Sequence, residues 1–124
     1  GVTEAMIGIN APVSDLDTAG WTLLYYLLDC NGDLWSDQYG HILSFGSYQT
    51  NDFTRGPALY PSEALALDQK IDDGKPGTGK VRTWRPSYVP NFNCTINDTT
   101  QTGETYNTAY GSNAACSMVF LLGF

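Results

Sequence analysis

The stretch Tyr60–Trp84, which reads YPSEALALDQKIDDGKPGTGKVRTW, carries the clearest local signals for structure in this chain. Within it, Ala64, Leu67 and Ile71 recur at spacings of three and four residues, which places them on one face of a helix. We therefore predict a helix over Ser62–Asp72, followed by a turn rich in glycine.

Both ends of this predicted helix are marked by residues that start or stop helices. The Ser62 hydroxyl can accept a hydrogen bond from a free amide of the first turn, so Ser62 is the expected N-cap. Gly74 suits the left-handed conformation that ends many helices, and Pro76 prevents continuation. Gly79 then permits a tight turn before a strand predicted over Lys80–Trp84.

Asp72 and Asp73 stand at the end of the helix, where the helix dipole disfavours negative charge by roughly 0.3–1 kcal/mol each. Three arrangements would offset this cost. The carboxylates could accept hydrogen bonds from the backbone amides of Gly74–Gly79, or bind calcium together with turn carbonyls. They could also form ion pairs with Lys70, Lys80 or Arg82. We expect the hydrogen bonds and ion pairs to act together, as a structural clamp between helix and strand.

The rest of the chain favours strands and loops. Trp21–Leu28 is almost continuously apolar, His41–Phe45 would return beside it, and Cys116–Leu122 would close the sheet. A chain of 124 residues fits a single domain, spanning 1–124. We predict an α+β fold in which the short helix packs on an antiparallel sheet, with a long C-terminal loop region.

The run PSEALALDQKIDDGKPGTGKV resembles a segment of bacterial prepilin-like proteins, which carry a type IV pilin-type N-terminal signal. The upstream pieces AMIGI, GWTLLYY and HILSFG are similar to the loop and strands that precede this segment in the same proteins. The resemblance covers roughly residues 5–82. The matching positions of the motif are Ala64, Asp68, Lys70, Ile71, Asp72, Asp73, Gly74, Pro76 and Gly79.

The resemblance implies a pilin-like or pseudopilin-like globular domain. The family's signature, an apolar N-terminal helix with a glutamate near its start, is not present in this sequence. The implied role is a non-catalytic structural subunit of a type IV pilus-like or type II secretion-like filament, with other pilin-like subunits as partners. The implied location is periplasmic or extracellular, after inner-membrane anchoring through the missing helix. Without that helix, we expect the chain alone to be monomeric or weakly associating.

The three cysteines are widely spaced. Cys94 and Cys116 bracket a polar stretch that resembles the disulfide-bounded loop of type IV pilins, which implies a bond between them and leaves Cys30 over. Closing this loop would stabilise the fold by roughly 3 kcal/mol. The alternative is three independent buried thiols. A zinc site is not indicated, because His41 is the only histidine and no two cysteines are close in sequence.

Charge is unevenly distributed along the chain. The net charge of −7 argues against a nucleic-acid-binding surface, which requires clustered Lys and Arg. Five of the six basic residues nevertheless fall within Lys70–Arg85. Some of them would neutralise Asp72 and Asp73, or they would form a basic patch that meets an acidic patch on a neighbouring subunit. The residues assigned to this interface are Lys75, Lys80, Arg82 and Arg85.

Other functions find less support in the sequence. The serines lack a nucleophile-elbow context, so no catalytic residue is assigned and the chain is not expected to be an enzyme. No cofactor is expected apart from calcium, which occurs in some pilin-like secretion subunits and for which Asp72 and Asp73 are the candidates. The alternative class is a secreted or cell-surface module that binds glycans or proteins through exposed aromatic side chains.

Overall fold

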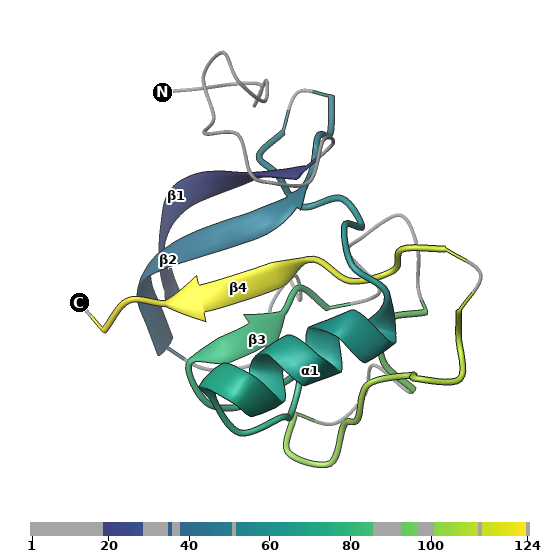
Figure 1. Ribbon diagram of the computed structural model, residues 1–124. Coiled ribbons are helices and arrows are strands. Elements are labelled where there is room, and N and C mark those ends of the chain that lie inside the picture. The colour runs from purple at the N-terminus through teal and green to yellow at the C-terminus, as the bar shows by residue number, and fades with distance from the viewer. Residues whose placement is uncertain are drawn as a thin grey trace.

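A computed structural model describes residues 19–28, 35, 38–50, 52–85, 93–96, 101–111 and 113–123. Figure 1 shows one helix packed beside a four-stranded sheet. The predicted α+β class is confirmed, and each predicted element is present with small shifts at its ends. The elements are β1 (Ala19–Leu28), β2 (Gln38–Ser47), α1 (Pro61–Ile71), β3 (Val81–Thr83) and β4 (Met118–Leu121).

The sheet is antiparallel throughout, with strand order β1-β2-β4-β3. Trp21 pairs with Phe45, and Phe45 in turn pairs with Met118, so the C-terminal strand lies inside the sheet. The chain therefore passes from β2 through α1 to β3 without pairing these two strands, and β4 lies between them. This order makes β1 and β3 the two edges of the described sheet.

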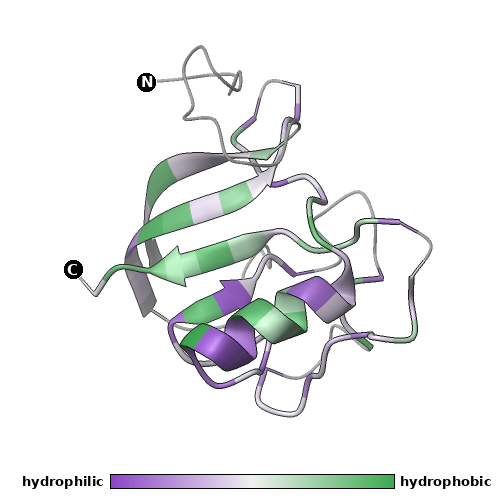
Figure 2. Cartoon of the chain, in the orientation of Figure 1, coloured by the Kyte–Doolittle hydropathy of each residue, from purple (hydrophilic) through white to green (hydrophobic). Residues whose placement is uncertain are grey.

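Apolar side chains form a core on each face of the sheet, as the alternation of a strand requires. Figure 2 shows hydrophobic residues along the strands and at intervals along α1. The smaller core contains Tyr39, Ile42, Trp84 and Val119. The larger core lies under α1 and contains Ala19, Phe45, Ala64, Val81, Cys94, Tyr106, Ala115, Cys116 and Met118.

A buried polar network supports the smaller core. The Trp84 indole donates to the Ser44 hydroxyl (2.8 Å), which donates to the Thr54 carbonyl (2.7 Å). Thr54 and Thr22 also join through their hydroxyls (2.7 Å). Because each of these polar atoms has a partner, the segment after β2 can cover the sheet without leaving a desolvated donor.

Helix α1 begins one residue before the predicted start. Pro61 occupies the first helical position, where its fixed φ is suitable and its missing N–H costs nothing. The Glu63 carboxylate accepts from the backbone N–H of Tyr60 (2.9 Å) and closes this end. The prediction of Ser62 as the N-cap is therefore wrong, because Ser62 is already inside the helix and exposed. Within the described residues, no helix is long and apolar enough to cross a membrane.

The structure confirms the disulfide between Cys94 and Cys116, both of which are buried. Cys116 exchanges two backbone hydrogen bonds with Leu59, just before α1, and the Cys94 carbonyl accepts from the Asn107 amide (2.9 Å). The bond thus fastens the C-terminal loop to the segment that leads into α1. Cys30 lies outside the described residues.

Candidate functional site

The C-terminal end of α1 is joined to β3 by hydrogen bonds to two adjacent carboxylates. Asp72 Oδ2 accepts from the backbone amides of Lys80 (2.6 Å) and Val81 (3.0 Å). Asp73 accepts from the Lys75 amide (2.9 Å) and the Thr78 hydroxyl (2.6 Å). The predicted backbone clamp is therefore present, although the amides that Asp72 engages lie just beyond the turn residues named from sequence.

Two glycines of the motif have the backbone conformation that this clamp requires. Gly74 has φ 75° and Gly79 has φ 76°, both in the left-handed region that residues with a Cβ rarely adopt. A Cβ at Gly79 would also overlap the Asp72 carboxylate. Pro76 is buried in the same turn, and its carbonyl accepts from the Thr83 amide (2.9 Å).

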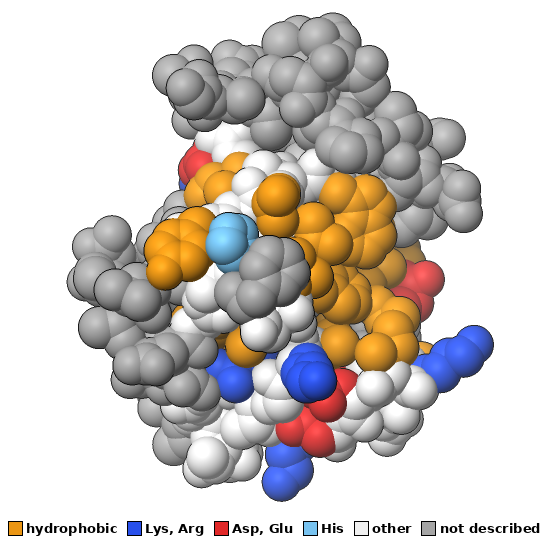
Figure 3. All heavy atoms as spheres, turned by 90° about the vertical axis from the view of Figure 1, so that its left-hand side faces the viewer, with side chains coloured by type: hydrophobic (Ala, Val, Ile, Leu, Met, Phe, Trp, Pro, Cys, Tyr) orange, Lys and Arg blue, Asp and Glu red, His pale blue; other side chains and the backbone are white. Residues whose placement is uncertain are grey.

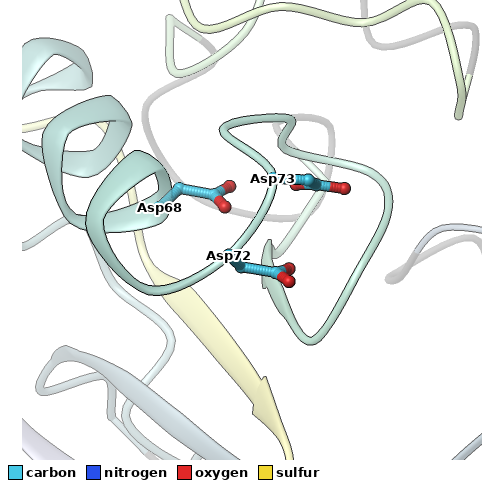
Figure 4. A group of neighbouring side chains, drawn as sticks. All are labelled: Asp68, Asp72 and Asp73. Atoms are coloured by element: carbon cyan, nitrogen blue, oxygen red, sulfur yellow. The ribbon is translucent and has the colours of Figure 1, made fainter.

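A third carboxylate, to which the sequence assigns a position in the motif but no role, lies at the centre of this site. Asp68 is 0% exposed, and its Oδ1 accepts from the Gly74 amide (3.0 Å). Its Oδ2 accepts from the hydroxyl of Tyr106 in the disulfide-bounded loop (2.6 Å). Figure 4 shows Asp68, Asp72 and Asp73 directed from the end of α1 into the turn that precedes β3. Asp68 therefore links α1, the turn and the loop.

Burial strongly affects the ionisation of Asp68 and Tyr106. The pKa of Asp68 is raised to about 6. Desolvation by burial is the largest cause and the charges of Asp73 and Asp72 add to it, while the hydrogen bonds from Tyr106 and Gly74 act in the opposite direction. Desolvation and the Asp68 carboxylate also raise the pKa of Tyr106. The Tyr106 hydroxyl is thus held as a hydrogen-bond donor.

We expect the free energy of unfolding to fall as the pH rises from about 4 to about 6, by roughly 2–3 kcal/mol from Asp68 alone. In that range the folded state binds more protons than the unfolded state, because the folded pKa of Asp68 is the higher one. Denaturant unfolding at several pH values, compared with Asp68→Asn, would measure this contribution as the difference between the two slopes. A carboxyl titration midpoint near 4 for Asp68 by NMR would contradict it.

The three carboxylates have the chemistry of a calcium site, since an oxygen of each lies within 4.8 Å of the others. However, five of their six oxygens already accept a hydrogen bond from an amide or a hydroxyl of the described residues. These donors already offset the negative charge that would otherwise attract a cation. The arrangement therefore accounts for the motif as a structural clamp without a metal.

The ammonium groups of Lys70 and Lys80 do not take part in this clamp. Among the described residues, neither Asp72 nor Asp73 forms an ion pair with Lys70 or Lys80, which corrects that part of the prediction. The side chains of Lys75 and Lys80 are exposed, where an ion pair would contribute little. The carboxylates instead accept hydrogen bonds from backbone amides and one hydroxyl, which the turn holds in place.

Two of the predicted interface residues are held against aromatic rings. Arg82 is buried, its guanidinium lies 5.1 Å from the ring centre of Tyr39, and its Nε donates to the Gly79 carbonyl (2.8 Å). Arg85 is half-buried with its guanidinium 5.4 Å from the ring centre of Trp35. An exposed basic patch that includes Arg82 is therefore wrong, because this side chain packs inside the fold.

A separate apolar groove lies between α1 and the sheet. It has a volume of about 260 Å³ and only apolar side chains line it. Figure 3 shows hydrophobic side chains gathered in a band on this face, above the charged side chains at the helix end. The apolar face predicted for the helix borders this groove, because Leu67 and Ile71 form one of its walls. The complete lining is Trp21, Phe45, Leu59, Leu67, Ile71 and Phe120.

Comparison with known proteins adds no relative to these observations. No protein-family model matches the chain, and neither a curated protein nor a solved structure gives a significant match.

Proposed function

We propose that this chain is the globular domain of a pilin-like or pseudopilin-like filament subunit, with a structural and non-catalytic role. Three features support the proposal: the α+β architecture, the Cys94–Cys116 disulfide that bounds a C-terminal loop, and the clamp at the end of α1. The clamp is built from the same motif residues that carry the sequence resemblance. Its effect is to fix the angle between α1 and β3.

The apolar groove is the observation that carries this proposal. A groove lined by Trp21, Phe120 and Leu67 without polar groups suits an apolar partner, because burying apolar surface stabilises by roughly 25 cal/mol per Å². The assembly helix of a filament subunit has that character. If it lay beside α1, the assembly helix would be a second helix on this face of the sheet.

The disulfide also supports the proposed location. Disulfides form and persist in oxidising compartments, such as the bacterial periplasm and the cell exterior. Cys94 and Cys116 are bonded and buried, which agrees with a periplasmic or extracellular domain. The partners in this proposal are other filament subunits.

Assembly in the cell tests the proposal. In the complete gene product we expect an apolar helix upstream of Gly1 and recovery of the protein in filaments sheared from the cell surface. Leu67→Glu, which places a charge in the groove, should abolish recovery, whereas Ala66→Glu on the exposed neighbouring position should retain it. Circular dichroism melts would verify that both variants fold. A reading frame without such a helix, together with filaments that lack the protein, overturns the proposal.

A binding module is the second candidate, and the exposed ring of Tyr25 favours it. Tyr25 is 60% exposed, and its ring lies at a steep angle to that of His41 with the ring centres 5.0 Å apart, so much of the Tyr25 side chain is accessible to a partner. Exposed rings of this kind stack on sugars or on protein side chains. Glycan-array binding that is lost in Tyr25→Ala would favour this candidate over the filament subunit.

A further inference from the structure

Asp73 and Gly74 form the only Asp–Gly pair in the sequence. Such a pair is prone to spontaneous rearrangement, because glycine places no side chain in the way of its own amide nitrogen. The nitrogen attacks the carboxyl carbon of the aspartate and closes a succinimide ring, while the carboxyl hydroxyl and the amide proton leave as water. Water then opens the ring. Opening at the main-chain carbonyl gives isoaspartate, in which the peptide bond runs through the side-chain carbon, and no further reactant is needed.

Both reacting groups of this pair are held by other partners. The Gly74 amide donates its hydrogen to Asp68 Oδ1 (3.0 Å), which reaches into the turn from α1 (Figure 4). The Asp73 carboxylate is held by groups beyond Gly74, since Oδ1 accepts from the Lys75 amide (2.9 Å) and Oδ2 from the Thr78 hydroxyl (2.6 Å). Ring closure requires the nitrogen to lose its proton and to meet the carboxyl carbon in a defined geometry. Both sets of hydrogen bonds must therefore open first.

We propose that Asp73–Gly74 is a latent site of isoaspartate formation, and that Asp68 protects it by holding the Gly74 amide. Burial does not protect the bond, because Asp73 is exposed and water can reach it. The acceptor is well fixed, because Asp68 is 0% exposed and also accepts from the Tyr106 hydroxyl (2.6 Å). The buried carboxylate therefore keeps the reactive nitrogen in place at an otherwise accessible bond.

Conversion would release the turn between α1 and β3. Isoaspartate adds one carbon to the main chain before Gly74 and replaces the side chain that accepts from Lys75 and Thr78. The left-handed backbone of Gly74 (φ 75°) and its bond to Asp68 would then no longer fit the lengthened chain. Loss of the protecting contact would therefore be followed by a covalent and irreversible opening of the clamp. This inference does not depend on the proposed filament role.

Prolonged incubation of the whole chain under native conditions tests the proposal, with isoaspartate located by peptide mapping and by enzymatic methylation of isoaspartyl groups. Asp68→Ala should convert faster than wild type on the order of tenfold, because the Gly74 amide loses a hydrogen bond to a charged acceptor. Asp68→Asn should convert like wild type, because its amide oxygen can still accept. Asp72→Ala is the matched control, since it removes a carboxylate of the same turn that does not contact Gly74, and it should also stay close to wild type.

Two further measurements do not depend on conversion in the Asp68→Ala variant. Hydrogen exchange of the Gly74 amide in wild type should be slow, and it should be faster in Asp68→Ala than in Asp72→Ala. Wild type held in denaturant should form isoaspartate at Asp73 on the order of tenfold faster than the folded chain. Equal rates in the folded and the denatured chain overturn the proposal. So does an Asp72→Ala variant that converts as fast as Asp68→Ala, because general loosening of the turn would then be the cause.

Discussion

Replacing Cys94 and Cys116 together by alanine should lower the free energy of unfolding by about 3 kcal/mol. The bond closes a loop with a sequence separation of 22 residues, and its loss restores conformational freedom to the unfolded chain. Both cysteines are buried in the larger core, so the folded state has little room to compensate. Denaturant unfolding of the double variant against wild type measures the difference.

The consequences should reach the end of α1, because the loop carries Tyr106. Its hydroxyl is the donor to Asp68 Oδ2, and the loop around it is also held by the bridge between Thr95 and Tyr106. Tyr106→Phe removes this donor while keeping the disulfide. It is the control that measures the contact between the loop and Asp68 alone. Equal stability of wild type and the double cysteine variant would contradict the role assigned to the bond, as would peptide mapping that finds both thiols free.

The local signals in the sequence were sufficient for the elements and for part of the site. The spacing of Ala64, Leu67 and Ile71 predicts α1, and the glycines and proline after it predict the turn. The start of the helix was misplaced because Ser62 is a common cap. Pro61 and Glu63, at the first and third helical positions, were the stronger pair of signals.

Residues that act through distant contacts were not predictable in the same way. Asp68 lies between Ala64 and Asp72 at helical spacing, which is a signal that it shares their face, but its partner Tyr106 is 38 residues away. The groove depends on β4 lying between β2 and β3, a strand order that no local pattern specifies. The strand predicted over His41–Phe45 likewise starts earlier, at Gln38, because Gln38 and Gly40 pair with the end of β1.

Asp72→Ala should destabilise the fold by roughly 2–4 kcal/mol. The Asp72 carboxylate is the acceptor for two backbone amides at the start of β3, and Val81 is buried, so its amide cannot turn to water when the acceptor is removed. Asp73→Ala should cost about 1 kcal/mol, because Asp73 is exposed and water can replace it at Lys75 and Thr78. Denaturant melting of the two variants measures both effects.

Glu63→Ala provides the matched control, since it also removes one carboxylate that accepts a backbone amide, but at the opposite end of α1. Its expected cost is about 1 kcal/mol, typical of a helix cap. If Asp72→Ala costs no more than Glu63→Ala, the clamp does not hold α1 to β3. Asp72→Asn should fall between Asp72→Ala and wild type, because the amide oxygen can still accept while the charge is gone.

The same melting series, repeated with added calcium and with a chelator, separates the clamp from a metal site. Ligand binding to the folded state alone raises stability with ligand concentration, so a bound ion would raise the unfolding midpoint of wild type and not of Asp72→Ala. The hydrogen bonds to Asp68, Asp72 and Asp73 lead us to expect the same midpoint with calcium as with chelator. A midpoint that rises with calcium in wild type alone would replace the clamp with a calcium site at these carboxylates.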